Sequence, residues 1–340
     1  MSGGYKMTKK NLENVKFYHN WNTLAASLHG LLDFYGKKYS RSQVMGLSTL
    51  AFRINMDKEI APYCPTTFDF TDWLNHVSHV FGIEFTTTML HQDTTDYGTQ
   101  KTKTINKIKE YIDNNNPVMY FDPSIYEWYL ITGYSTEKDE LYITGTDGEY
   151  VLTYEELGTT EDTNLLWCIF PTKTKKMDTP DAFYTTLNYI VNHYYHETPS
   201  EKLMETGYTY GYNAWNQWIH TIKKGNINEF GHSYNLRVIL SAREDAWNFL
   251  NFLYDMVPGF KTNELETAIT GYRYTIDYLL RAEDLYPFYQ WDETTIKTDD
   301  HRTKQCVEWL TLAYEWETKA IDNIKTFLKN NEHYTETTKK

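Results

Sequence analysis

Apolar side chains recur every three or four residues in two stretches of the chain, a spacing that predicts amphipathic helices. In the first stretch, helices are expected over residues 23–36, 42–49, 70–81 and 101–115. In the second, they are expected over residues 181–196, 208–223, 233–256, 262–282 and 301–330. The first helix follows asparagines at positions 20 and 22, either of which can cap its N-terminus, and Gly36 stands where a helix commonly ends.

Short apolar runs and alternating positions, which are typical of β-strands, occur before the last helix of the first stretch and between the two helical stretches. Strands are expected over residues 83–90, 117–121, 126–132, 140–144 and 165–170. The polar segment over residues 133–139 joins two of these strands as a hairpin turn. Helices followed by such strands indicate the α+β class with an antiparallel sheet.

The segment over residues 173–180 is polar and basic, follows Pro171 and ends at Pro180, as is typical of a linker. Every predicted element beyond it is a helix. The sequence therefore predicts a flexible tail over residues 1–16, an α+β domain over residues 17–172, a linker over residues 173–180 and an all-α domain over residues 181–332. In the third helix of the all-α domain, Arg243 lies near the apolar face, so we expect an acidic partner for it.

The chain of 340 residues has 46 acidic and 33 basic residues and a net charge of −13. Negative charge repels phosphate backbones, so nucleic acid is not an expected partner, whereas a cationic amine would be attracted.

No 18-residue apolar segment and no apolar run near the N-terminus is present, so we expect neither a membrane span nor a signal peptide. The expected location is the cytoplasm.

The three cysteines, Cys64, Cys168 and Cys306, are far apart and show no CxxC spacing. They predict neither a zinc site nor a disulfide framework. His76 and His79 can share a helix face, but no third ligand follows at a matching spacing. No metal or other cofactor is expected.

Three groups of segments carry a resemblance to a known family. They are residues 23–36 with 42–47, residues 117–121 with 129–134 and 141–143, and residues 211–218 with 234–235 and 242–250. Together they resemble the butirosin-biosynthesis acyltransferase family over nearly the whole chain. Such proteins combine a papain-like N-terminal domain, related to double-glycine bacteriocin-processing peptidases, with a helical C-terminal domain.

In that family a thiolate attacks a carrier-bound thioester, a histidine moves the proton, and the acyl group passes to an amine. The resemblance places the nucleophile at Thr23, the histidine at Trp128 and the third catalytic residue at Asp147. The amide side chains expected to stabilise an oxyanion are those of Asn20 and Asn22. A tryptophan cannot accept a proton, so the resemblance implies that both the cysteine and the histidine have been replaced.

Other residues can take part in a rearranged site. Cys64 lies in a loop between Pro62 and Pro65 and is a second candidate nucleophile, because a loop thiolate can be reactive if it is stabilised. Glu127, beside Trp128, is a candidate general base. The residues expected to line a substrate site are Asn20, Trp21, Asn22, Glu127 and Trp128.

Two classes of function stay open at this point. One is an acyltransferase or amidase of natural-product biosynthesis that makes or cleaves an amide at a rearranged site. The other is a non-catalytic relative that binds an acyl chain, a carrier protein or another partner. The expected partners are a small amine or acyl substrate and an acyl or peptidyl carrier protein.

Overall fold

The computed structural model describes residues 8–68, 70–160, 164–174, 179–195, 207–225, 227–290, 295–298 and 300–333. The chain divides into two compact units, each made from two separate segments. The sheet unit comprises residues 1–40 and 82–175, and the helical unit comprises residues 41–81 and 176–340. An antiparallel sheet and a C-terminal helical region confirm the α+β class.

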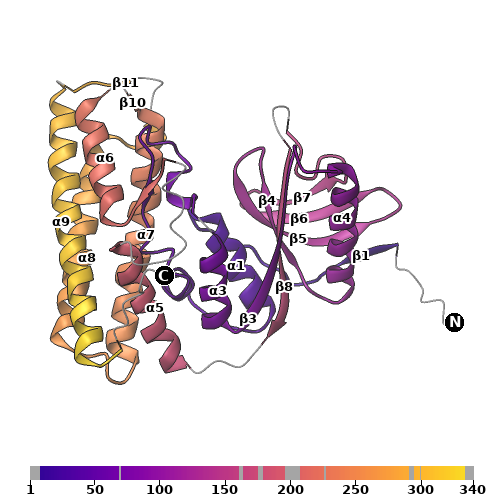
Figure 1. The fold of residues 1–340 in the computed structure, drawn as a ribbon, viewed down its shortest axis with the longest axis horizontal. Coiled ribbons are helices and arrows are strands. Elements are labelled where there is room, and N and C mark those ends of the chain that lie inside the picture. Colours follow the sequence, from indigo (N-terminus) through magenta and orange to yellow (C-terminus); the bar gives the residue numbers. More distant parts are fainter. Residues whose placement is uncertain are drawn as a thin grey trace. The chain divides into compact units, whose positions relative to one another are not determined.

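The sheet unit contains one seven-stranded antiparallel sheet (Figure 1). Its strands are β1 (Lys9–Asn11), β3 (Ile83–His91), β4 (Val118–Asp122), β5 (Glu127–Ser135), β6 (Glu140–Gly145), β7 (Gly148–Thr153) and β8 (Leu165–Thr174). The order across the sheet is β3-β8-β4-β5-β6-β7, with β1 paired to the end of β5. The two helices of this unit are α1 (Thr23–Phe34) and α4 (Tyr97–Asp113).

Helix α4 supplies the apolar cover for the central strands (Figure 1). Its isoleucines recur at helical spacing and are buried; they are Ile105, Ile108 and Ile112. They pack with strand residues that include Val118 and Tyr120. Burial of this stripe against the sheet is the favourable term that holds α4 in place.

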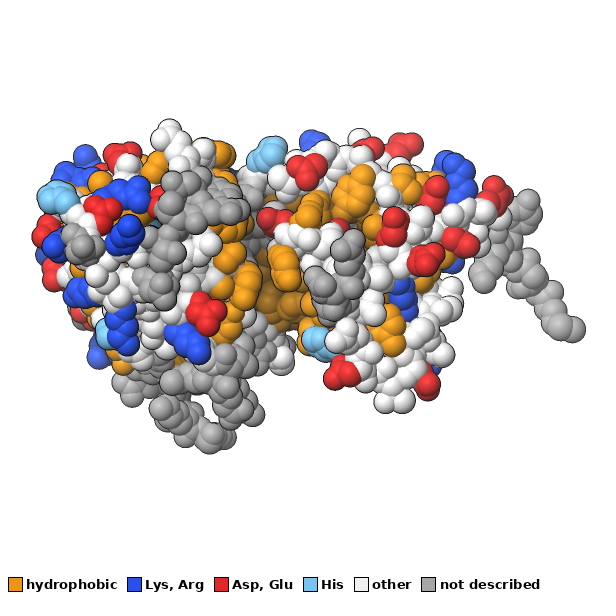
Figure 2. All heavy atoms as spheres, turned by 90° about the horizontal axis from the view of Figure 1, so that it is seen from above, with side chains coloured by type: hydrophobic (Ala, Val, Ile, Leu, Met, Phe, Trp, Pro, Cys, Tyr) orange, Lys and Arg blue, Asp and Glu red, His pale blue; other side chains and the backbone are white. Residues whose placement is uncertain are grey.

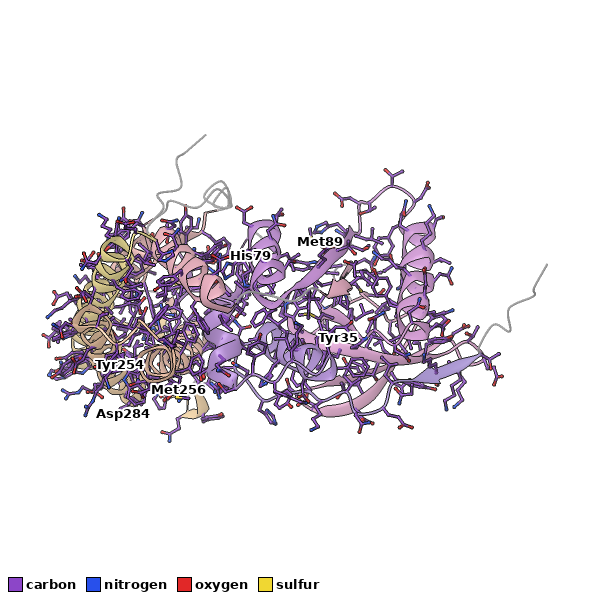
Figure 3. All side chains as sticks on the ribbon, turned by 90° about the horizontal axis from the view of Figure 1, so that it is seen from below. Tyr35, His79, Met89, Tyr254, Met256 and Asp284 are labelled. Carbon is purple, nitrogen blue, oxygen red and sulfur yellow. The ribbon has the colours of Figure 1, made fainter. Side chains whose placement is uncertain are left out.

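Helix α1 packs closely on β5 because Gly30 has no side chain. A Cβ at Gly30 would lie 2.1 Å from the carbonyl oxygen of Lys16 and 2.9 Å from Leu130 Cδ1. At the C-terminal end of α1, Tyr35 (Figure 3) donates a 2.6 Å hydrogen bond to the side chain of Asn116. The helix is therefore fixed against the sheet along its length.

The helical unit contains α2 (Arg41–Leu47), α3 (Phe70–Phe81), α5 (Thr179–Tyr194), α6 (Tyr212–Lys224), α7 (Glu229–Met256), α8 (Asn263–Leu285) and α9 (His301–Asn330). Short 3-10 turns lie at η1 (Cys64–Thr66) and η3 (Phe288–Gln290). Two-stranded pairs are formed by β2 (Asn55–Met56) with β9 (Thr209–Tyr210) and by β10 (Ile227–Asn228) with β11 (Thr295–Ile296). None of the described helices is long and apolar enough to cross a membrane.

A buried ion pair at the centre of the helical unit explains why residues 41–81 belong to it. Arg243 on α7 donates to both carboxylate oxygens of Glu317 on α9, at 2.6 and 2.7 Å, and neither side chain is exposed. Arg243 also donates to the backbone carbonyls of Ala51 and Arg53, at 3.1 and 2.8 Å. The expectation of an acidic partner for Arg243 is confirmed, and the same guanidinium ties the early segment to the late helices.

The domain boundaries differ from those expected. A single domain over residues 17–172 was predicted, but residues 41–81 group with the late helices instead. The expected tail over residues 1–16 contains β1, which is held by backbone pairing to β5. The expected linker over residues 173–180 is shorter, because β8 continues to Thr174 and α5 begins at Thr179.

Breaking the central ion pair tests its importance for the helical unit. In Arg243→Met, Glu317 is left buried and without its cation, so we expect the free energy of unfolding to fall by about 3–5 kcal/mol. The matched control is Arg237→Met, which removes an arginine bonded at 3.2 Å to the partly exposed Glu283; a loss of about 1 kcal/mol or less is expected. Urea denaturation measures the free energy of unfolding of both variants. Equal losses would contradict the importance assigned to the Arg243–Glu317 pair.

Candidate functional site

Thr23 is the first residue of α1, and the residues before it fix that position. Asn22 is the N-cap, and its side-chain oxygen accepts a 3.1 Å hydrogen bond from the Ala25 backbone N–H. Asn20 Oδ1 in turn accepts from the Asn22 N–H at 2.9 Å. The chain therefore enters the helix through two successive side-chain caps, which place the Thr23 hydroxyl at the helix N-terminus.

The Thr23 hydroxyl joins α1 to the first residues of β5. Thr23 Oγ1 donates a short hydrogen bond to Glu127 Oε2. It accepts a second hydrogen bond, at 3.0 Å, from the backbone N–H of Trp128. Thr23 is 7 % exposed, so both bonds lie largely away from solvent.

Trp128 does not take the position that we expected for the base. Its ring packs with Phe121 and Trp167, at centroid separations of 5.5 and 4.9 Å, and is 3 % exposed. The side chain that reaches Thr23 is that of Glu127, one residue earlier. Side chains alternate along a strand, so those of Glu127 and Trp128 leave β5 in opposite directions.

A bulge in β5 explains this difference of one residue. The register between β5 and β6 shifts between Ile131 and Gly133. As a result, Ile131 and Tyr134, three residues apart, both join the core under α4. A count back from Gly133 crosses this bulge, so the sequence alone cannot assign the strand face of Glu127 or Trp128.

Glu127 is a carboxyl group in an environment that disfavours its charge. Burial raises its pKa, the hydrogen bond from Thr23 lowers it, and the nearby negative charge of Asp147 raises it further. Asp147 is exposed in the turn between β6 and β7. Within the part of the chain that the structure describes, no lysine, arginine or histidine forms an ion pair with Glu127.

The remaining expected site residues of the sheet unit lie at the start of α1. Asn20 and Asn22 use their side-chain oxygens to accept backbone N–H groups, which leaves the amide nitrogens as the donor ends of both side chains. Trp21, between them, is partly buried. The structure thus brings Thr23, Glu127 and the Trp128 backbone into direct contact, with Asn20 and Asn22 next to Thr23 in the chain and Asp147 acting through its charge.

Cys64 belongs to the helical unit and lacks the properties of a nucleophile. Its side chain is fully buried, and its sulfur accepts a 3.3 Å hydrogen bond from the Asp57 N–H. Burial raises the pKa of the thiol, which opposes thiolate formation at neutral pH. Cys168, on β8, and Cys306, on α9, are also fully buried with raised pKa values.

The histidine pair on α3 does not form a shared metal site. The His76 ring is buried, bonds to the Leu47 carbonyl at 2.9 Å and packs on Tyr189. The His79 ring is exposed (Figure 3) and its Nε2 lies 3.4 Å from Asp181 Oδ2. Among the described residues no group of three or more histidine, cysteine, aspartate or glutamate side chains could hold a metal ion.

No known protein-family model matches the chain, and no curated protein sequence matches it either.

The raised pKa of Glu127 predicts a pH-dependent effect of Glu127→Gln. In the unfolded chain the carboxyl ionises near its ordinary value of 4.5. As the pH rises from that value through the higher folded-state pKa, the folded protein holds more protons and wild-type stability falls. Glu127→Gln removes this loss, which amounts to about 1.4 kcal/mol for each pKa unit.

We therefore expect Glu127→Gln to match the wild type near pH 4 and to be more stable at pH 7.5 in urea denaturation. Glu137→Gln, the same change at an exposed position of the same unit, is the control and should show no such difference. A variant less stable than the wild type at pH 7.5 would show that the ionised hydrogen-bonded pair is stabilising instead.

Proposed function

We propose that the sheet unit is a papain-like domain, related to the butirosin-biosynthesis acyltransferases, that binds the ammonium group of a small amine without covalent catalysis. In this proposal Glu127 is the anionic partner of the amine, and Thr23 and the Trp128 N–H orient the carboxylate. The observation that carries the proposal is the partly buried Glu127 carboxylate, which has a hydroxyl donor but no cation among the described residues.

The placement of the pair supports the papain-like relationship. Thr23 is the first residue of α1, where a papain-like protein has its nucleophile, and Glu127 is the first residue of β5, on the strand expected to carry the base. Asp147 follows β6, close enough to influence Glu127. The resemblance places Thr23 and Asp147, and Glu127 is adjacent to a position that it places. These three residues thus interact with one another through the Glu127 carboxyl group.

The chemistry of the pair favours binding over nucleophilic attack. A cysteine thiol with a pKa near 8.5 readily gives its proton to an imidazole, whereas an aliphatic hydroxyl is a far weaker acid and a carboxylate a weaker base. The Thr23 hydroxyl is also engaged in two hydrogen bonds and nearly buried. These features make it a better positioning group than a nucleophile.

Electrostatics favour a cationic ligand. An isolated carboxylate in a buried position is unfavourable unless a cation or several donors compensate it. Asp147 adds negative charge at Glu127, and the chain as a whole has a net charge of −13. Acidic and basic side chains both occur on the face shown in Figure 2.

A second function is favoured by the same hydrogen bond. Thr23 Oγ1 points its proton at Glu127, which is the arrangement of a hydroxyl nucleophile with a carboxylate general base. The side-chain amide of Asn22 would then be the nearest candidate donor to an oxyanion. Such a site would transfer an acyl group from a thioester through an ester on Thr23.

The test of the proposal compares two sugars that differ in charge. At pH 7, glucosamine is expected to bind the full-length protein in calorimetry, whereas N-acetylglucosamine, which lacks the positive charge, is not. Glu127→Gln should weaken glucosamine binding at least tenfold, and the exposed control Glu137→Gln should leave it unchanged. Binding should also weaken as the pH falls through the raised pKa of Glu127, because the carboxyl then loses its charge.

Intact-mass measurement after incubation with an acyl N-acetylcysteamine thioester separates the two functions. Non-covalent binding predicts no mass increase on the wild type. An added acyl mass that disappears in Thr23→Val would overturn the proposal in favour of the hydroxyl nucleophile. Equal affinity of the wild type and Glu127→Gln for glucosamine would also contradict it, as would no binding at all.

A further inference from the structure

The helical unit contains a buried arginine that forms no ion pair with any carboxylate of the described residues. Arg53 follows α2 and is 4 % exposed. Its guanidinium lies over the Phe68 ring, with 4.2 Å from Cζ to the ring centroid, and Nη1 donates to the Tyr189 hydroxyl at 3.4 Å. Its Nε has no hydrogen-bond partner within the described part of the chain.

The other arginines of this unit that are held in hydrogen bonds all have acidic partners. Arg243 binds Glu317, Arg237 binds Glu283, Arg302 binds Glu229 and Arg41 binds Asp245. These partners compensate the charge of each guanidinium. Arg53 departs from this pattern although it is one of the two most deeply buried of the set.

The backbone around Arg53 is fixed on both sides, so the position of the side chain is not adjustable at low cost. The Arg53 carbonyl accepts from Arg243 at 2.8 Å. The next carbonyl, of Ile54, accepts from the Gly211 N–H at 3.1 Å. Asn55 and Met56 then form β2 and pair with β9.

A second unpartnered donor lies two residues along the same extended segment. Asn55 is 3 % exposed, and its Nδ2 has no hydrogen-bond partner among the described residues. Residues i and i+2 of an extended chain project to the same side. The guanidinium of Arg53 and the amide of Asn55 therefore offer two buried N–H donors to one side of the segment.

Neither His76 nor Tyr189 compensates the charge of Arg53. His76 packs on Tyr189, and its pKa is lowered to about 4 by burial, with further lowering by the charge of Arg53. It is therefore neutral at pH 7, and its Nε2 is already bonded to the Leu47 carbonyl. One positive charge and two free donor groups remain for a ligand.

We propose that Arg53 and Asn55 form a binding site for the carboxylate group of a small-molecule ligand. A guanidinium binds a carboxylate through paired N–H donors, and the Asn55 amide adds a further donor. The single positive charge matches the single negative charge of a carboxylate, whereas a phosphate dianion would leave a buried excess charge. This site lies in the helical unit and does not depend on the Thr23–Glu127 proposal.

The experiment measures thermal unfolding of the full-length protein at pH 7 and constant ionic strength, with acetate or phosphate replacing chloride. Acetate is expected to raise the Tm of the wild type, and each tenfold increase above its Kd adds about 1.4 kcal/mol to the free energy of unfolding. Arg53→Met should abolish the response and should not lower the Tm in chloride, because it removes an uncompensated charge. Asn55→Ala should weaken acetate binding several-fold.

The control is Arg273→Met, which removes the same charge from an exposed position on α8 and should keep the full acetate response. A wild type that is indifferent to acetate would overturn the proposal, as would an equal response in Arg53→Met. A response to phosphate alone would overturn the assignment of a carboxylate. If Arg53→Met does not fold, a full acetate response in Asn55→Ala would count against the site.

Discussion

The need to satisfy a partly buried carboxylate is the constraint on which the site of the sheet unit depends. Glu127 begins β5, and the Thr23 hydroxyl at the start of α1 is its hydrogen-bond donor. The same hydroxyl is held by the Trp128 N–H, so helix and strand meet through one oxygen atom. Because this contact uses both hydrogen-bonding functions of the hydroxyl, it positions the carboxylate and leaves its charge available to a ligand.

Charge compensation distinguishes two kinds of ionic group among the described residues. In the helical unit, Arg243 and Glu317 neutralise each other and bind the early segment to the late helices. Arg53, in the same unit, is buried, and Glu127, in the sheet unit, is partly buried; neither has such a partner among the described residues. In both of our proposals an oppositely charged ligand supplies the missing partner.

The sequence predicts elements well where an apolar period is strong. The helix expected over residues 70–81 is α3 with the same bounds, and the strand expected over residues 83–90 is one residue shorter than β3. β7 was missed because it is a largely exposed edge strand, and β1 because its three polar residues give no apolar pattern. The grouping of residues 41–81 depends on bonds from Arg243 to two backbone carbonyls, which have no sequence pattern. At the site, Thr23 and Asp147 came from the resemblance, and Glu127 was a candidate because it stands beside Trp128, but the contact between Thr23 and Glu127 has no sequence pattern. A single arginine such as Arg53 gives no periodic signal.

The most direct test of the central claim is to measure the pKa of Glu127. The titration is observed by NMR of the carboxyl carbon, and Glu127→Gln assigns the signal. The account predicts a pKa above the ordinary value of 4.5 in the free protein. Saturation with glucosamine should lower that pKa, because a bound ammonium group stabilises the carboxylate. A pKa at or below 4.5 in the free protein, or one that does not change with glucosamine, would contradict the account.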